Sequence, residues 1–274
     1  MTLSAEPVTQ ASMLPALKPG VYILGAGPGD PDLMTVRGQR LLQQADVILY
    51  ANSLVPQQVL NWTRPDAEKI GTASLTLESI LPLMVARVQS GKSVVRLHSG
   101  DPSLYSAIHE QIQALSEADV PFEVIPGISA FQAAAAKLNA ELTIPGLVQS
   151  IILTRISGRT HVPETEELAS LAAHQTSLCL YLSARHVEAA QTQLMTHYPA
   201  NTPVAICYRV GWPDERIQVV PLTEMAATTQ QENWIRTTLY IISPALTAAA
   251  ARSQLYSPSH THLFRQRAAQ GVKE

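Results

Sequence analysis

The sequence has little cysteine and no long hydrophobic run, and both absences restrict the class of protein. Its two cysteines, Cys179 and Cys207, each lie inside an apolar stretch, and neither belongs to a Cys-x-x-Cys or Cys/His ligand pattern. They are therefore predicted to be buried reduced thiols. No stretch reaches the length of a membrane span, and residues 1–17 lack the basic start and apolar run of a signal peptide. We expect a cytoplasmic protein with no membrane partner.

Charge is also scarce, since only 15% of the residues are charged and the formal net charge is −3. The basic residues form no runs, so the chain lacks the electrostatic footprint of a nucleic-acid-binding protein. None of the eight histidines belongs to a His-x-x-x-His or comparable ligand set, and no protein-bound metal is predicted. What the 274 residues do contain is 46% hydrophobic residues, enough for one large or two modest domains.

One stretch, residues 94–105, combines an apolar strand with a functional turn. Its opening, Val-Val-Arg-Leu, is typical of a buried parallel strand, and Ser-Gly-Asp-Pro at 99–102 follows where α/β proteins bind ligands. Gly100 lets a ligand approach the backbone closely, and Asp101 can accept hydrogen bonds from ribose hydroxyls or an amine. The alternative is that Asp101 caps a helix that begins near Ser103.

A glycine-rich turn follows the first predicted strand. Three glycines occur in Gly-Ala-Gly-Pro-Gly-Asp at 25–30, but the pattern fails the dinucleotide fingerprint. Asp30 occupies the position of the third glycine, and Pro28 removes a backbone donor from the region that would hold a pyrophosphate. The turn is weak evidence for NAD, and it suits a pocket for an uncharged or cationic ligand.

The predicted elements indicate an α/β protein whose character changes near Gly127. Before it, strands alternate with helices, which requires a parallel sheet. The predicted strands there are 21–24, 47–50, 94–97 and 122–125, and the helices are 33–45, 77–90 and 103–118. After it, the predicted strands are 148–154, 177–182, 204–210, 216–220 and 239–243, and the helices are 130–139, 164–173, 185–197 and 222–231.

The last two predicted strands leave room for no more than one short helix between turns, so a mixed sheet is predicted. The expected organisation is a flexible arm at 1–17, a parallel-sheet domain at 18–127, a mixed-sheet domain at 128–246 and a partly disordered tail at 247–274.

Four turns, taken together, resemble one known family. They are Gly-Ala-Gly-Pro-Gly-Asp at 25–30, Ser-Gly-Asp-Pro at 99–102, Pro-Gly-Ile-Ser-Ala at 126–130 and Tyr-Arg-Val-Gly-Trp-Pro-Asp-Glu-Arg at 208–216. The set is similar to the S-adenosylmethionine-dependent tetrapyrrole methyltransferases, over nearly all of 21–246. The resemblance implies the tetrapyrrole methylase fold, with two α/β domains and the active site in the cleft between them, and a homodimer.

Within that family, the segments at 51–55, 97–101, 152–159 and 212–216 look most like the precorrin-4 C11-methyltransferases of cobalamin biosynthesis. Asn52 departs from that subfamily, in which glycine is expected. The implied reaction transfers a methyl group from S-adenosylmethionine to C-11 of precorrin-4 or cobalt-precorrin-4 and leaves S-adenosylhomocysteine. The alternatives are a family member that acts at another ring position, as on uroporphyrinogen III or precorrin-2/3, and a nucleotide-binding module without methyl transfer.

The resemblance also implies where the cofactor binds. The contacts carried over are Pro28, Ser99, Gly100, Asp101, Leu104, Ser129, Ala130, Leu182, Val210 and Thr238. A sulfonium cofactor carries no phosphate, so the failed dinucleotide fingerprint becomes an expected feature. The acidity of Asp101 suits the amine or ribose end of such a cofactor.

Candidates for the chemistry and for substrate binding complete the predicted site. The polar candidates for a general base are His98, Tyr105 and Asp46. A tetrapyrrole substrate carries many carboxylates, which a planar guanidinium grips in two places.

The candidates for substrate binding are Arg155, Arg159, Arg209 and Trp212. For Arg155 and Arg159, the alternative is a surface ion pair with Glu164 or Glu166. For Trp212, the alternative is an anchored turn.

Overall fold

The computed structural model describes residues 16–247 and residue 257, and it divides the chain into two compact units. Unit 1 consists of Met34–Gly127 and the chain before Gly27, and unit 2 consists of Gly27–Leu33 and the chain from Ile128 on. The segment Gly27–Leu33 therefore belongs to unit 2, whereas the expected domain at 18–127 includes it. The expected arm at 1–17 and the expected tail at 247–274 lie almost wholly outside the described residues.

Unit 1 contains a five-stranded sheet in the order β3-β2-β4-β1-β5. The strands are β1 (Gly20–Gly25), β2 (Val47–Tyr50), β3 (Glu68–Gly71), β4 (Ser93–His98) and β5 (Phe122–Ile125). All pairs are parallel, as predicted, so the five carboxyl ends lie at one edge of the sheet. The sequence analysis did not predict β3, a short edge strand whose Glu-Lys-Ile-Gly sequence is only half buried.

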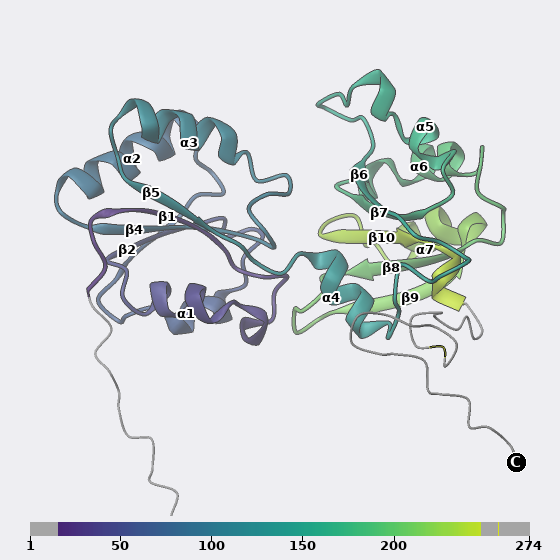
Figure 1. The fold of residues 1–274 in the computed structure, drawn as a ribbon, viewed down its shortest axis with the longest axis horizontal. Coiled ribbons are helices and arrows are strands. Elements are labelled where there is room, and N and C mark those ends of the chain that lie inside the picture. Colours follow the sequence, from purple (N-terminus) through teal and green to yellow (C-terminus); the bar gives the residue numbers. More distant parts are fainter. Residues whose placement is uncertain (1–15, 248–256, 258–274) are drawn as a thin grey trace, which may run out of the picture. The chain divides into compact units, whose positions relative to one another are not determined.

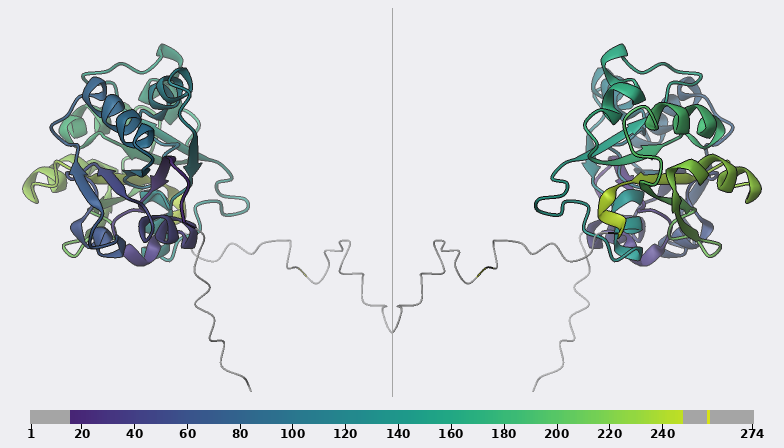
Figure 2. Two further views of the ribbon diagram at one scale, coloured as in Figure 1. Left: turned by 90° about the vertical axis from the view of Figure 1, so that its left-hand side faces the viewer. Right: turned by 90° about the vertical axis from the view of Figure 1, so that its right-hand side faces the viewer.

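Helices cover both faces of this sheet (Figures 1 and 2). On one face, α1 (Val36–Leu42) and the 3-10 helix η2 (Gln57–Trp62) pack against a cluster with Leu24 and Leu97. On the other face, α2 (Leu77–Gln89) and α3 (Ile108–Glu117) pack against a cluster with Val94. The sheet therefore has both faces buried, as the apolar sequence of its central strands requires.

The prediction that a helix begins near Ser103 is wrong, because α3 begins at Ile108. Tyr105 and Ala107 have φ of 55° and 49°, which lies in the left-handed region and cannot continue a right-handed helix. Asp101 therefore does not cap α3, whose N-cap is Ala107.

Unit 2 contains a five-stranded sheet in the order β6-β7-β10-β8-β9. The strands are β6 (Ile151–Arg155), β7 (Ser177–Tyr181), β8 (Pro203–Tyr208), β9 (Arg216–Pro221) and β10 (Thr238–Ile242). Only β6 and β7 pair in parallel, and β10 and β9 are antiparallel to their neighbours. The predicted mixed sheet is confirmed.

Two apolar clusters bury the faces of this second sheet, and Figure 1 shows the helices that cover it. One face carries α5 (Leu168–Ala172), α6 (Val187–Leu194) and α7 (Met225–Gln231), and the other carries α4 (Ala130–Lys137). The predicted helices that begin at 164, 185 and 222 each start as a 3-10 turn, and these turns are η3 (Glu164–Glu166), η4 (Ala184–His186) and η5 (Leu222–Glu224). Two further 3-10 turns are η1 (Pro31–Leu33) and η6 (Pro244–Thr247).

The two cysteines of unit 2 are buried free thiols, as predicted. Burial raises the pKa of both Cys179 and Cys207 to about 12, so they stay protonated at neutral pH. Among the described residues, no helix combines the length and the apolar character that crossing a membrane requires.

Candidate active site

Three glycine-containing turns meet at the carboxyl edge of the unit 1 sheet, after β1, β4 and β5. A Cβ atom on Gly25 would lie 2.6 Å from the carbonyl oxygen of Gly100 and 2.7 Å from Cα of Gly127. No side chain fits there, and Gly100 also has φ of 67°, which favours glycine. The turns therefore pack backbone against backbone at the edge where parallel sheets bind ligands.

Asp101 fixes this packing. One carboxylate oxygen accepts a hydrogen bond from the backbone N–H of Gly127 at 2.8 Å, and the other accepts from the N–H of Ser103 at 2.8 Å and from the Ser103 hydroxyl. Partial burial raises the pKa of Asp101, but the hydrogen bonds from Ser103 and Gly127 outweigh it and hold the pKa below its usual value. A carboxylate has about four acceptor sites, so Asp101 retains capacity for one further donor.

The other predicted residues of this turn differ in exposure. Ser99 and Leu104 are half buried, Tyr105 is 44% exposed, and His98 is buried at the end of β4. Burial, aided by the positive charge of Arg96, lowers the pKa of His98 to about 3. An imidazole of that pKa has little affinity for a proton at neutral pH. The structure thus places two base candidates, His98 and Tyr105, at the carboxyl edge, and only Tyr105 is accessible.

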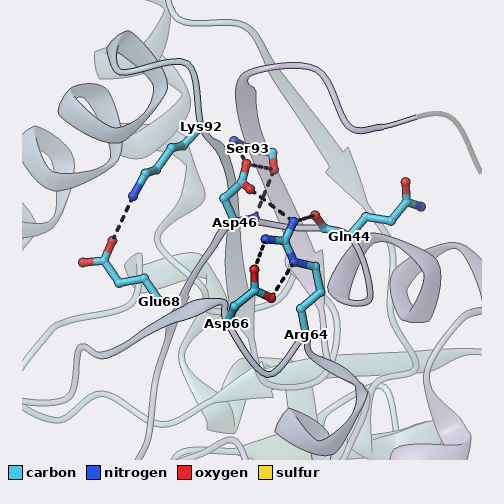
Figure 3. A network of polar contacts seen from close by, with 7 residues as sticks. All are labelled: Gln44, Asp46, Arg64, Asp66, Glu68, Lys92 and Ser93. Atoms are coloured by element: carbon cyan, nitrogen blue, oxygen red, sulfur yellow. Dashed lines mark hydrogen bonds and ion pairs between the residues drawn. The ribbon is translucent and has the colours of Figure 1, made fainter.

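Asp46 lies elsewhere. It precedes β2 and lies beside Ser93 at the start of β4 (Figure 3), so it is at the amino edge of the parallel sheet, whereas Asp101 follows the carboxyl end of β4. Its carboxylate accepts from the backbone N–H of Ser93 at 2.8 Å, from the Ser93 hydroxyl at 2.7 Å and from Arg64 at 3.2 Å. The structure does not bring Asp46 together with the other two base candidates.

In unit 2, the predicted residues gather at one edge of the mixed sheet. Thr238 begins β10 and pairs with Tyr208 at the end of β8, and Leu182 directly follows β7, the other neighbour of β10. Arg155, at the end of β6, pairs with Tyr181. Residues from four strands, distant in the sequence, therefore share this edge.

Three non-glycine residues at this edge adopt left-handed backbone conformations. Leu182, Arg209 and Thr237 have φ of 53°, 48° and 53°, and the N–H of Arg209 donates to the carbonyl oxygen of Thr237 at 2.9 Å. Each such residue costs free energy, and such residues are concentrated at functional sites. The side chain of Leu182 is 66% exposed despite being apolar, which leaves an apolar surface available to a ligand.

Two predicted contacts, Ser129 and Ala130, lie at the start of α4. The Ser129 and Tyr181 hydroxyls are 2.8 Å apart, and the N–H of Phe131 donates to the Tyr181 oxygen at 3.2 Å. Tyr181 thereby joins the start of α4 to the end of β7. Tyr181 was not among the predicted site residues, although a tyrosine at the end of an apolar strand could have indicated it.

The turn that carries Pro28 packs against Trp212. Pro28 is buried, and a Cβ atom on the neighbouring Gly29 would lie 2.5 Å from Cδ1 of the Trp212 indole. The Arg209 guanidinium lies 4.0 Å from the centre of the Trp212 ring and forms an ion pair with Asp214 at 3.0 Å. Trp212 therefore anchors a turn and also holds Arg209 in place, while its buried indole Nε1 has no hydrogen-bond partner among the described residues.

Of the two arginine candidates after β6, Arg155 orders the loop that follows the strand. Arg155 donates to the carbonyl oxygens of Thr160 at 2.9 Å and His161 at 3.0 Å, and Arg159 is exposed. In the described part of the chain, neither arginine pairs with Glu164 or Glu166, so the ion-pair alternative is wrong.

The departure at Asn52 has a local explanation. Its backbone does not need glycine, because its φ is not positive, and its side-chain oxygen accepts from the N–H of Ala73 at 2.9 Å. Within the described residues, no three His, Cys, Asp or Glu side chains form a group that could hold a metal ion.

The two sheets and the glycine turns are those of a two-unit α/β protein with turns at the edge where parallel sheets bind ligands. Comparison with known proteins identifies the family. The chain belongs to the tetrapyrrole (corrin/porphyrin) methylases, whose family model matches residues 20–226. The family, the methyltransferase class and the fold predicted from the sequence are confirmed.

Three individual proteins show how far the similarity extends. The precorrin-4 C(11)-methyltransferase of Pseudomonas aeruginosa is 45% identical over 89% of this chain and 98% of its own length. The X-ray structure of a cobalamin biosynthetic enzyme, cobalt precorrin-4 methyltransferase, superposes with a TM-score of 0.81 at 42% identity, over 83% of this chain and 96% of that one. The uroporphyrin-III C-methyltransferase of Thermus thermophilus complexed with S-adenosyl homocysteine gives 0.69 at 28% identity, over 85% and 96%.

Proposed function

We propose that this chain transfers a methyl group from S-adenosylmethionine to C-11 of precorrin-4 or cobalt-precorrin-4, giving the precorrin-5 level intermediate of cobalamin biosynthesis. The observation that carries the proposal is the gap in similarity. Proteins named for C-11 methylation of precorrin-4 or its cobalt form are 39–45% identical over 86–92% of this chain, whereas a siroheme synthase of Yersinia pestis is 36% identical over 77% and the uroporphyrin-III enzyme is 28% identical. Relatives of both names occur at similar identity, so the proposal covers both substrates.

The residues of the two edges fit the proposed cofactor. In unit 1, Asp101 keeps one acceptor site for a ribose hydroxyl or an amine, beside turns made of glycine. In unit 2, the exposed Leu182 side chain offers an apolar surface to an adenine ring, and Thr238 begins the strand that neighbours β7. None of these groups forms a phosphate-binding set of backbone N–H donors, which agrees with a cofactor that has no phosphate.

The bound cofactor would supply an electrophilic methyl group: the substrate carbon would form the new bond with a π electron pair of the ring, the sulfur would keep the electron pair of the broken bond, and the tetrapyrrole would lose a proton from another of its atoms. The protein must orient the carbon about 3–3.5 Å from the methyl group, and such positioning supplies about 7–11 kcal/mol. Of the two base candidates at the carboxyl edge of unit 1, Tyr105 is the exposed one. In unit 2, Arg209 is pre-oriented by Trp212 and Asp214 to bind a substrate carboxylate.

The experiment has a binding step and a turnover step. S-adenosylhomocysteine is titrated calorimetrically into the wild-type protein, Asp101→Ala and the surface control Asp119→Asn. We expect micromolar affinity that only Asp101→Ala weakens. Turnover is then measured by mass spectrometry with precorrin-4, cobalt-precorrin-4 and uroporphyrinogen III. Methylation of uroporphyrinogen III alone would replace the proposal with its nearest alternative, and no binding by folded protein would overturn it.

We also propose that the protein works in the cytoplasm as a homodimer. The two buried free thiols support a reducing compartment, and the family resemblance supports the dimer. Sedimentation equilibrium of the full chain tests the dimer, and a single species with the mass of one chain would overturn it.

A further inference from the structure

Arg96 is a buried cation that has no counter-ion among the described residues. It lies on β4 with 6% of its surface exposed. Its Nη1 donates to the Thr72 hydroxyl at 2.9 Å and its Nε donates to the side-chain oxygen of Gln111 at 3.3 Å. Both acceptors are neutral. Burial lowers the pKa of Arg96 to about 10, with no carboxylate acting on it, so the group is still charged at neutral pH.

The acids of unit 1 do not supply the missing charge. Asp101 is held by Ser103 and Gly127, and Glu68 forms ion pairs with Arg87 and Lys92. Within the described residues no carboxylate pairs with the Arg96 guanidinium. An unpaired buried charge costs several kcal/mol, so proteins rarely keep one without a use for it.

His98 provides a second unused group on the same face of β4. It follows Arg96 by two residues, and alternate side chains of a strand point to the same face. Its exposed fraction is 6%, and its Nε2 is buried with no hydrogen-bond partner among the described residues. A charged guanidinium and an unpartnered imidazole nitrogen thus share one face of β4, close enough that the charge of Arg96 contributes to lowering the pKa of His98.

Their place in the fold is the carboxyl edge of the parallel sheet, where ligands bind. Gln111 connects Arg96 to the loop between β4 and α3, because the side-chain nitrogen of Gln111 donates to the carbonyl oxygen of Ala107 at 3.0 Å. That loop contains Tyr105, whose side chain is exposed. A group that entered beneath the loop would meet Arg96 and His98 together.

We propose that Arg96 and His98 form an internal carboxylate site that receives one side-chain carboxylate of the tetrapyrrole. The guanidinium supplies the charge and paired N–H donors, and an oxyanion selects the His98 tautomer with hydrogen on Nε2. Because Nε2 is buried, the loop that carries Tyr105 and Ala107 must shift to admit the carboxylate. The identity of the ligand rests on the proposed function, whereas the site itself does not.

The test introduces a carboxylate beside Arg96 by substitution. It then measures whether the protein still responds to a carboxylate added in solution. Thr72→Asp places a charge next to Arg96 Nη1, and Thr72→Asn is the neutral control of nearly the same shape. Thermal unfolding is followed at constant ionic strength with succinate and with neutral succinamide. We expect succinate alone to stabilise the wild type and Thr72→Asn saturably. We expect Thr72→Asp to unfold at a higher temperature than Thr72→Asn and to lose the response to succinate.

Two further measurements address the residues directly. The ¹⁵N shift of His98 Nε2 should move on adding succinate, and His98→Leu should weaken succinate binding about tenfold, as loss of a hydrogen bond to a charged group implies. Should Thr72→Asp fail to fold, Gln111→Glu places the charge at Nε, with wild-type glutamine as its isosteric control. Equal responses to succinate and succinamide, or a full succinate response in the charged variant, would overturn the site.

Kinetic measurements with the tetrapyrrole test this site independently of the proposed function. KM for the tetrapyrrole should rise about tenfold in Thr72→Asp relative to Thr72→Asn, with kcat and the affinity for S-adenosylhomocysteine unchanged. If succinate stabilises the protein as expected but KM is the same in both variants, the site serves a free carboxylate and the substrate assignment is overturned. If no tetrapyrrole is methylated although the succinate response holds, the proposed function fails and the site stands.

Discussion

The carboxylate of Asp101 accepts a hydrogen bond from the backbone N–H of Gly127, 26 residues further along the chain, at 2.8 Å. This contact joins the turn after β4 to the turn after β5, and Gly100 and Gly127 approach too closely to admit a side chain between them. The same carboxylate holds Ser103 through its other oxygen. One acidic residue therefore sets the shape of the unit 1 edge.

Asp101→Asn should lower both stability and cofactor affinity. An amide offers one acceptor oxygen in place of two, so either Gly127 or Ser103 loses its partner, at a cost of about 1–3 kcal/mol. Urea unfolding measures the stability, and calorimetric titration measures binding of S-adenosylhomocysteine. Asp119→Asn removes the same charge from an exposed residue and should change neither. Equal behaviour of the two variants would contradict a structural role for Asp101.

Gly127→Ala and Gly146→Ala separate steric from backbone effects. A Cβ atom on Gly127 would collide with the Gly100 carbonyl, although its φ is not positive, and overpacking of this kind costs about 1–3 kcal/mol or more. Gly146 has open space but φ of 78°, so alanine there pays only the left-handed backbone cost of about 1–2 kcal/mol. Binding of S-adenosylhomocysteine should be lost in Gly127→Ala and kept in Gly146→Ala.

The stability of unit 1 should depend on pH through Asp46. Its backbone hydrogen bond from Ser93 lowers the pKa of Asp46, with Arg64 adding to the effect. The folded pKa is below the unfolded value of about 3.9, so the contribution is complete above that value and is lost as pH falls through the folded pKa. Urea unfolding from about pH 6 down to pH 2 should show the wild-type advantage over Asp46→Asn shrinking toward zero.

The same variant tests whether Asp46 is the general base. Because Asp46 lies at the amino edge of the sheet, we expect Asp46→Asn to keep kcat within about twofold once folded. A fall of about a hundredfold would restore Asp46 as the base and contradict its placement in the network of Figure 3.

Leu182→Gly should stabilise the protein and weaken cofactor binding. Glycine removes the strain of the left-handed backbone conformation, which costs about 1–2 kcal/mol. The greater entropy of glycine in the unfolded chain offsets part of this gain. The exposed leucine side chain is lost, and with it the apolar surface offered to the adenine. Asn233→Gly, at φ of 55° in an exposed position, should leave affinity for S-adenosylhomocysteine unchanged. A weaker fold with unchanged affinity would contradict the functional interpretation of Leu182.

The local sequence pattern was sufficient to predict most of the fold and the positions of the turns that follow its strands. Alternating apolar runs and glycine turns predicted the parallel and mixed sheets, because buried strands and tight turns are local in sequence. The late start of α3 was missed because left-handed Tyr105 and Ala107 carry no sequence signal. The short β3 was missed because Glu68–Gly71 is half polar.

The site was harder to predict where it depends on contacts between distant residues. Arg155 was expected to bind substrate or to form an ion pair, yet it donates to two loop carbonyls. Arg96 was passed over, although an arginine among apolar strand residues was a usable signal. Its burial without a carboxylate depends on how β4 packs, which spacing alone does not reveal.

Arg209 should discriminate the substrate through its geometry as well as its charge. The guanidinium stacks on Trp212 and pairs with Asp214, so its side chain is already ordered before a carboxylate binds. Arg209→Gln should raise KM for the tetrapyrrole by about 10–100-fold, the value of one hydrogen bond to a charged group, with kcat little changed. Arg209→Lys should not restore KM, because an ammonium neither stacks as a plane nor binds a carboxylate in two places. Arg216→Gln removes a neighbouring exposed charge and controls for the overall field. Full rescue by lysine, or an equal effect of Arg216→Gln, would show that charge alone acts here and that the stacking on Trp212 serves only to anchor the turn.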